Sequence, residues 1–285
     1  MTGGAESGGA GEGESAGAVM QVRDARRLGS ARRFRIYLLE ARFQVVEVLR
    51  EPMFAIPTLA FPLIFYLFFG VIMGTGGASL AVPTYVLATY GVFGVLGPAL
   101  FGFGAGLANE RDTGVLLLKQ TTPMPAGAYL FAKVMSALIF GAAVVLGLFL
   151  MAAHAAGVAL YRWQWFALAG VLLTGVIPFC ALGLAIGAWA KGRAAVAVVN
   201  LVFLPMSMLS GLWLPIYMFP DVMQDIALAL PAYHHAQLAL KVIAMDAGQS
   251  VAVHVSVLVI ETLIFLAVAA LGFRRAGTFS IRRSR

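Results

Sequence analysis

Several uninterrupted apolar stretches constrain this chain more than any other feature of its sequence. An apolar helix of about 20 residues is long enough to cross the hydrocarbon layer of a bilayer. The chain is 61% hydrophobic and only 12% charged, whereas soluble proteins are typically about 45–50% apolar and about 25% charged. Because lipid offers no hydrogen bonds to the backbone, such stretches must be helical. The sequence therefore predicts an all-α integral membrane protein.

Six spans are predicted from the apolar stretches. They cover residues 53–73, 85–108, 134–153, 166–190, 194–214 and 251–273. The fourth and fifth are separated only by Lys191, Gly192 and Arg193, which indicates a tight hairpin. Together they form a predicted six-span transmembrane domain over residues 52–273.

The distribution of positive charge predicts the orientation of these spans. Of the 20 Lys and Arg residues, eight precede the first span, three lie between the second and third, two lie in the hairpin and five follow the last span. Only Arg162 and Lys241 fall on the other side. Since positive charge is enriched on the cytoplasmic side, we expect both termini in the cytoplasm. The net charge of +7 then reflects anionic lipid headgroups, and no nucleic-acid partner is predicted.

The segments outside the spans have distinct compositions. Residues 1–22 are rich in Gly, Ala, Ser and Glu and are predicted to be a disordered cytoplasmic tail. Residues 23–51 are predicted to form an amphipathic helix in the cytoplasmic interface, and Pro52 marks the turn into the first span. Residues 274–285 form a basic cytoplasmic tail. With no cleavable signal pattern, the first span is expected to act as an uncleaved anchor.

The segment between the fifth and sixth spans is too apolar for a solvated loop. Pro220 and Asp221 are typical of a helix start, and Pro231 is expected to stop that helix. Short re-entrant helices in the outer leaflet fit this pattern, because such backbone is tolerated where protein covers it.

Glu261 is the most informative polar residue within the spans, since it falls near the middle of the last one. An ionised carboxylate there costs about 2.5–3.5 kcal/mol. His254 lies two turns earlier, and Asn200 or Ser207 of the fifth span would supply hydrogen bonds if those helices touch. Two interpretations stay open: a polar point on a substrate path or proton site, and a protonated carboxyl with one interhelical hydrogen bond.

Other candidate sites are not supported by their patterns. "GAWAKGRA" from Gly187 has Arg and Ala where a phosphate-binding loop needs Lys and Ser or Thr. "GFGAG" at 102–106, like Gly183 and Gly187, is typical of small-residue helix packing. The adjacent His234 and His235 lack a spaced metal-ligand pattern, so no metal site is predicted. The single cysteine, Cys180, is expected to be a packing residue, and no set of catalytic residues is visible.

The stretch "NERDTGVLLLKQTTPMP" at 109–125 gathers charges between the second and third spans. Asp112 or Thr113 is expected to cap a short helix that carries Val115 to Leu118, and prolines end it. Such a helix is suited either to a groove on a partner or to the lipid interface.

The order of these parts resembles the permease subunit of type 2 ATP-binding cassette exporters. The resemblance covers nearly the whole chain after residue 30. Two motifs carry it, one after the second span and one after the fifth. The first is matched by Glu110, Arg111, Asp112, Gly114, Thr122 and Pro123, and the second by Ser210, Gly211, Pro215, Pro220 and Pro231. One departure is that Val115, Leu116 and Leu117 stand where the family often has Thr-Leu-Glu.

The resemblance implies half of a transporter. Two permease chains, identical or different, would form the pathway, and separate cytoplasmic ATPase subunits would grip the first motif, including Leu117, and the amphipathic helix. The chain would bind no cofactor itself, with ATP and Mg²⁺ held by the partner. Few charges in the spans favour a hydrophobic or amphipathic cargo in a bacterial cytoplasmic membrane. Two alternatives remain: a proton-coupled carrier that uses Glu261 and His254, and a membrane scaffold without transport.

Overall fold

The structure, a computed structural model, describes residues 30–74, 81–121 and 124–275, and these residues form helices joined by turns and irregular connections, without a strand. The predicted tail 1–22, the first residues of the predicted amphipathic helix and most of the basic tail lie outside the described residues. Over the described part, the prediction of an all-α integral membrane protein is confirmed.

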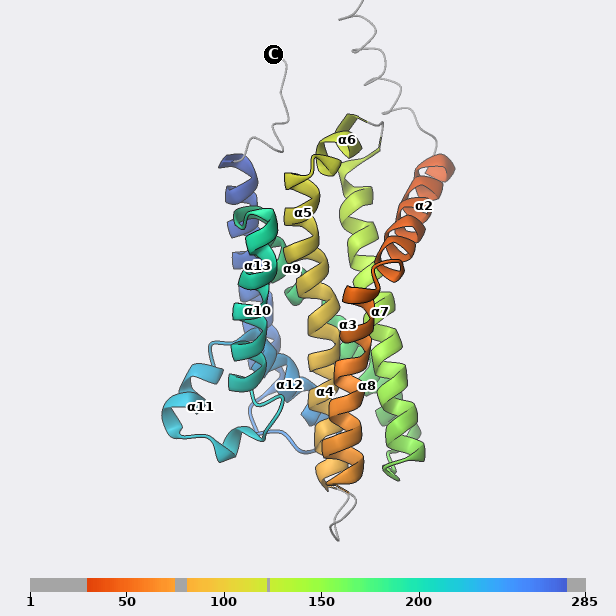
Figure 1. Cartoon of the computed structure of the whole chain (residues 1–285). Coiled ribbons are helices and arrows are strands. Elements are labelled where there is room, and N and C mark those ends of the chain that lie inside the picture. Colours follow the sequence, from red (N-terminus) through yellow and green to blue (C-terminus); the bar gives the residue numbers. More distant parts are fainter. Residues whose placement is uncertain (1–29, 75–80, 122–123, 276–285) are drawn as a thin grey trace, which may run out of the picture.

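The helices follow one another with short connections. In chain order they are α2 (Ser30–Leu49), α3 (Pro52–Phe65), the π-helix η1 (Tyr66–Ile72), α4 (Ala81–Leu100), the π-helix η2 (Phe101–Gly106), α5 (Leu107–Asp112), α6 (Val115–Thr121), α7 (Ala126–His154), α8 (Arg162–Thr174), α9 (Val176–Trp189), α10 (Gly192–Leu209), the 3₁₀-helix η3 (Ile216–Met218), α11 (Asp221–Ala227), α12 (Pro231–Val242) and α13 (Val251–Arg275). Figure 1 shows a bundle with α6, the start of α2 and the end of α13 at one end, and α11 and α12 at the other.

Five continuous helical segments of the described part are long and apolar enough to cross a membrane. They are Ala55–Ile72, Ala81–Asp112, Gly127–His154, Arg162–Trp189 and Val251–Arg275. They correspond to the predicted first, second, third, fourth and sixth spans. The apolar part of α10, Ala194–Leu209, is shorter, so the six-span count stays a prediction. The tight hairpin is confirmed, since α9 ends at Trp189 and α10 begins at Gly192.

Two of the predicted connections are also present. Pro52 is the first residue of α3, as its missing N–H allows. Helix α11 begins at Asp221 and ends at Ala227. Pro231 then starts a further helix, α12, so this segment is more helical than the sequence indicates. The position of α11 and α12 relative to the bilayer stays a prediction.

Helix α4 forms the centre of the bundle, where most of its residues are buried. It packs against α3, α7, α9 and α12. Small residues allow the close approach: a Cβ on Gly91 would lie 2.6 Å from Cδ1 of Leu172. Close packing of this kind drives helix association in lipid. In contrast, α13 contacts chiefly α9 and α12 and leaves most of its apolar side chains exposed.

The expected glycine packing of α9 is confirmed. A Cβ on Gly187 would lie 2.5 Å from the carbonyl oxygen of Phe103, and one on Gly183 would lie 3.0 Å from that of Ala99. A Cβ on Gly104, on the facing π-helix, would likewise lie 3.6 Å from the carbonyl oxygen of Gly183. The end of α9 is therefore held directly against the backbone of η2, just before α5.

Candidate functional site

The charged triplet Glu110, Arg111 and Asp112 does not lie on a free loop. It forms the last turn of α5, which continues the long α4–η2 helix. Gly114 turns the chain with a φ of +79°, a value that glycine adopts without steric cost. Helix α6 then begins at Val115. The triplet is thus rigidly attached to a spanning helix.

Glu110 is buried at the centre of a charge cluster, with 7% of its surface exposed. Its carboxylate accepts a hydrogen bond from the Lys133 ammonium at 2.7 Å and one from the Tyr129 hydroxyl at 2.9 Å. The Lys119 ammonium lies 3.9 Å away and binds Glu40 at 3.0 Å. A buried carboxylate needs such partners. The cluster consequently joins α2, α5, α6 and α7.

Arg111 and Asp112 hold the α9–α10 hairpin. The Arg111 guanidinium donates to the carbonyls of Gly187 at 3.1 Å and Ala188 at 2.8 Å, and also to that of Ala190. These carbonyls lack helical partners at the end of α9, and a cation there complements the helix dipole. The Asp112 carboxylate accepts a hydrogen bond from the Gly192 N–H at 2.5 Å, at the first residue of α10.

The expectation that Asp112 or Thr113 caps α6 is wrong, because both side chains bond elsewhere. Asp112 binds the start of α10, and the Thr113 hydroxyl donates to the Asn109 carbonyl at 2.8 Å within α5. A sequence pattern cannot distinguish a cap for the following helix from one for a helix that lies 80 residues later.

Helix α6 presents apolar side chains to its surroundings. Leu116 is 3% exposed, whereas Leu117 and Leu118 are 66% and 67% exposed. Two adjacent exposed leucines at the end of a bundle are typical of a contact surface. Thr122 and Pro123 of the same motif lie outside the described residues.

Three cavities follow one another along the bundle, from the α6 end to the α11 end. The acidic cavity, about 720 Å³, is lined by Gln44, Glu47, Glu51, Asn109, Glu110 and Lys133, together with Phe101. The aromatic cavity, about 430 Å³, is lined by Phe61, Phe65, Phe93, Phe101, Phe203 and Trp213. The far-end cavity, about 830 Å³, is lined by Tyr85, Trp213, Pro215, Tyr217, Gln237 and Asp246. Phe101 and Trp213 are each shared by two neighbouring cavities.

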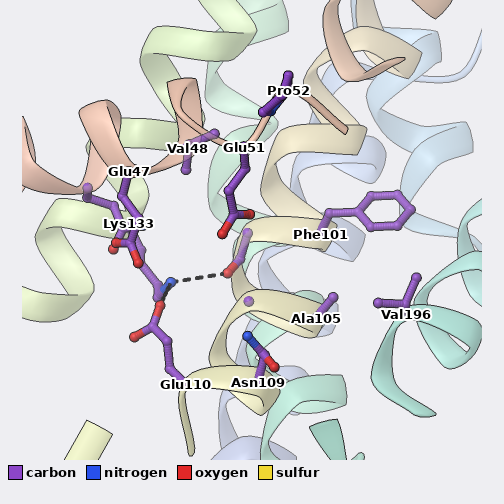
Figure 2. Close-up of a pocket in the computed structure, with 13 residues that line it drawn as sticks. Glu47, Val48, Glu51, Pro52, Phe101, Ala105, Asn109, Glu110, Lys133 and Val196 are labelled. Carbon is purple, nitrogen blue, oxygen red and sulfur yellow. Dashed lines mark hydrogen bonds and ion pairs between the residues drawn. The ribbon is translucent and has the colours of Figure 1, made fainter. Parts of the chain in front are cut away.

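The acidic cavity lies between the α2–α3 junction and the η2–α5 segment. In Figure 2 the Glu47 and Glu51 side chains come from the α2–α3 side and Phe101, Ala105 and Asn109 from the facing η2–α5 helix, while Val196 comes from α10. Partial burial raises the pKa of Glu47 above its ordinary value, and the nearby Glu110 carboxylate acts in the same direction. Three carboxylates, those of Glu47, Glu51 and Glu110, line this cavity beside one ammonium, that of Lys133.

The aromatic cavity is bounded by stacked rings. Phe65 and Trp213 stack with ring centres 5.9 Å apart, and Phe93 and Phe203 stack at 5.1 Å. The predicted pathway residue Asn200 lines this cavity, and its amide donates to the Val196 carbonyl at 3.0 Å. Ser207 is fully buried and donates to Phe203 at 2.7 Å.

Glu261 and His254 do not contact each other in a shared site. The His254 ring, fully buried, has its Nδ1 atom 2.9 Å from Nδ1 of His234 on α12. One carboxylate oxygen of Glu261 is buried without a hydrogen-bond partner among the described residues. Helix α13 packs chiefly on α9 and α12 rather than on α10, so the expected help from Asn200 or Ser207 is not present. Neither Glu261 nor His254 lines the three cavities.

The second motif lies in the turns that follow α10, and its Pro215 lines the far-end cavity. Gly211 has a φ of +75° and its carbonyl accepts the Tyr85 hydroxyl at 3.4 Å. Ser210 is buried, and Pro215 precedes η3. Pro220 and Pro231 lie at the starts of α11 and α12. The motif thus shapes the turns after α10.

Sequence reasoning missed several residues of these cavities. Glu47 and Glu51 fall within the segment 23–51 that is predicted as an amphipathic helix, and Lys133 is one of the three positive residues between the second and third spans, which indicate orientation only. Phe101 and Trp213 resembled ordinary span residues. A signal for Lys133 was present, since a lysine at the edge of an apolar span requires an anionic partner when it is buried.

Comparison with known proteins gives two matches. The model of the ABC-2 type transporter family matches residues 37–243. A Bacillus subtilis (strain 168) protein, YvfS, which is named as a candidate transport permease, is 30% identical over 192 residues, covering 67% of this chain and 78% of the relative.

Proposed function

Because the chain belongs to the ABC-2 type transporter family and is a multi-pass transport permease subunit, we propose that it forms the substrate path of an ATP-driven exporter. The cargo is hydrophobic or amphipathic, such as a drug, a lipid or a lipid-linked glycan. The permease domain covers residues 52–273, and the membrane is the bacterial cytoplasmic membrane with both termini in the cytoplasm.

The observation that carries this proposal is the row of three cavities. They extend from the α6 end of the bundle to the α11 end, and Phe101 and Trp213 each line two neighbouring cavities. A path with aromatic side chains at these shared positions suits stepwise passage of an apolar molecule. The aromatic cavity is rich in ring surface, which binds apolar groups through large contact areas.

A separate ATPase subunit is proposed to drive the cycle, as membership of the family implies. We place its contact on Leu117 and Leu118 of α6, which are exposed beside the charge cluster. The cluster around Glu110 ties α6 to α2 and α7, while Arg111 and Asp112 tie α5 to the α9–α10 hairpin. A push on α6 would therefore move several spanning helices together, as a change between two rigid arrangements.

A second permease chain is proposed to complete the path. The acidic and aromatic cavities are both lined by α10 residues, Val196 and Asn200. The neighbouring Leu201 and Leu204 are 74% and 45% exposed. A second chain seated against α10 would cover these leucines and close both cavities, and lipid would contact α13.

The test concerns the contact on α6. The double variant Leu117→Asn, Leu118→Asn should retain folding, because both side chains are exposed, but should lose most ATPase subunit in co-purification and most transport-coupled ATP turnover. The matched control is Val222→Asn, an exposed apolar residue of α11 at the opposite end, which should leave both unchanged.

Two outcomes would contradict the proposal. One is co-purification and ATP turnover that are equal for the double variant and the control. The other is transport that continues without ATP and stops with an uncoupler, which would instead support a proton-coupled carrier. A folded chain that moves none of a panel of amphipathic compounds would support the scaffold alternative.

A further inference from the structure

The acidic cavity has an unusual balance of charge for a membrane protein. Three carboxylates line it, those of Glu47, Glu51 and Glu110, against the single ammonium of Lys133. That ammonium is already bound to Glu110 at 2.7 Å and to the Gly102 carbonyl at 3.4 Å. The other nearby ammonium, on Lys119, binds Glu40 at 3.0 Å.

Glu47 and Glu51 are exposed carboxylates that neither ammonium neutralises by direct contact. Neither makes an ion pair within the described ranges. The pKa of Glu47 is raised, because burial and the Glu110 carboxylate disfavour its charged form more than Lys119 and Lys133 favour it. A bound cation would relieve both effects.

Gln44 provides an independent observation. Its side chain lines the same cavity and is 5% exposed, and its Oε1 atom is buried without a hydrogen-bond partner. Buried acceptors are almost always satisfied, and an unsatisfied one costs about 1–3 kcal/mol. An amide oxygen beside two carboxylates lacks a donor, and a group with several N–H donors would satisfy it.

The cavity continues into an apolar one. Phe101 lines both the acidic and the aromatic cavities. Beyond it lie Phe65, Phe93 and Phe203, whose rings accept flat apolar groups and also attract cations at their faces. A molecule with a positive head and an aromatic or aliphatic body would fill the two cavities in that order.

We propose that the acidic cavity binds the protonated amine of an amphipathic organic cation, with its apolar body in the aromatic cavity. This assigns a substrate class to the path and rests on the proposed function. Glu47 and Glu51 supply the charge, and Gln44 accepts one N–H of the ammonium group.

The experiment uses three probes with the same body: pyrenebutylamine, pyrenebutanol and pyrenebutyrate. The full-length chain is placed in nanodiscs of zwitterionic phosphatidylcholine, without nucleotide. Binding is followed by energy transfer from tryptophan to pyrene, with empty nanodiscs as the background. We expect the amine to bind at least tenfold more tightly than the alcohol, and the carboxylate most weakly.

The variant Glu47→Gln, Glu51→Gln should weaken amine binding at least tenfold and leave the alcohol unchanged. Gln44→Met, which keeps the side-chain size, should weaken the amine severalfold. Asp221→Asn, Asp225→Asn, which removes two exposed carboxylates on α11, is the charge-matched control and should have no effect.

Equal affinity for the amine and the alcohol would overturn the inference, as would an equal loss of all three probes in the carboxylate variant. Because no ATPase subunit is present, this result is independent of the α6 variants. Unchanged coupling in the α6 double variant together with an intact amine preference would contradict the proposed function alone. Loss of coupling in that variant without an amine preference would contradict this inference alone.

Discussion

Arg111 donates to three carbonyl groups at the end of α9, although it belongs to a motif that looks like a surface loop. Its guanidinium has several donors in a fixed plane, which a lysine ammonium does not match. The sequence placed Arg111 correctly beside a span. The partner was not predictable, because the hydrogen bonds join residues 76 to 79 positions apart.

Arg111→Ala should lower the stability of the folded chain by about 2 kcal/mol, since hydrogen bonds to charged groups contribute about 1.5–3 kcal/mol. Arg111→Lys should restore only part of this loss. Cys180 is the single cysteine of the chain and is buried, so a thiol-reactive dye reports unfolding during heating. Arg162→Ala, at an exposed position on α8, is the control. Equal midpoints for Arg111→Ala and this control would contradict the capping role.

At the scale of elements, the lengths of the apolar stretches in the sequence predicted the long helices well. Two features escaped the sequence: the π-helices η1 and η2, and the continuity of α4, η2 and α5. The charges at the end of α5 resemble a loop in sequence, yet each is paired with α7 or the hairpin. Ion pairs and hydrogen bonds between helices lower the free-energy cost of burying these charges beside a span. The sequence pattern does not show such partners.

Gly187→Ala tests the close approach of α9 to η2. The added Cβ would lie 2.5 Å from a backbone carbonyl oxygen, which cannot rotate away. Overpacking of this kind costs about 1–3 kcal/mol. Gly170→Ala on α8 is the matched control, because a Cβ at that position would meet no other described side chain or backbone atom within 4 Å. Folded yield and the thermal midpoint should fall for the first variant only. A full yield with an unchanged midpoint for Gly187→Ala would contradict direct backbone packing here.

At the scale of the whole molecule, the start of α2 and the end of α13 lie at the same end of the bundle as α6 (Figure 1). This agrees with the even number of spans proposed from the sequence. The distribution of lysine and arginine predicts that this end lies in the cytoplasm. The three cavities, in contrast, could not be predicted, because they depend on how α3, α4 and α10 lean on one another.

Cysteine labelling checks this orientation. Leu118→Cys on α6 and Tyr217→Cys on η3 are both exposed positions, at 67% and 76%. With a membrane-impermeant maleimide, Tyr217→Cys should react in intact cells and Leu118→Cys only after permeabilisation. The buried Cys180 should give little background. The reverse pattern would show that the orientation is inverted.

The sharing of Phe101 and Trp213 between neighbouring cavities also bears on the electrical insulation of the cell. Rings at a narrow point repel water, and hydrated ions do not pass a dry constriction. If the proposed path runs through these cavities, rings held at the two shared positions would keep it from filling with a continuous column of water. Cargo would then be expelled one molecule at a time while the membrane potential, on which the rest of the cell draws, stays charged.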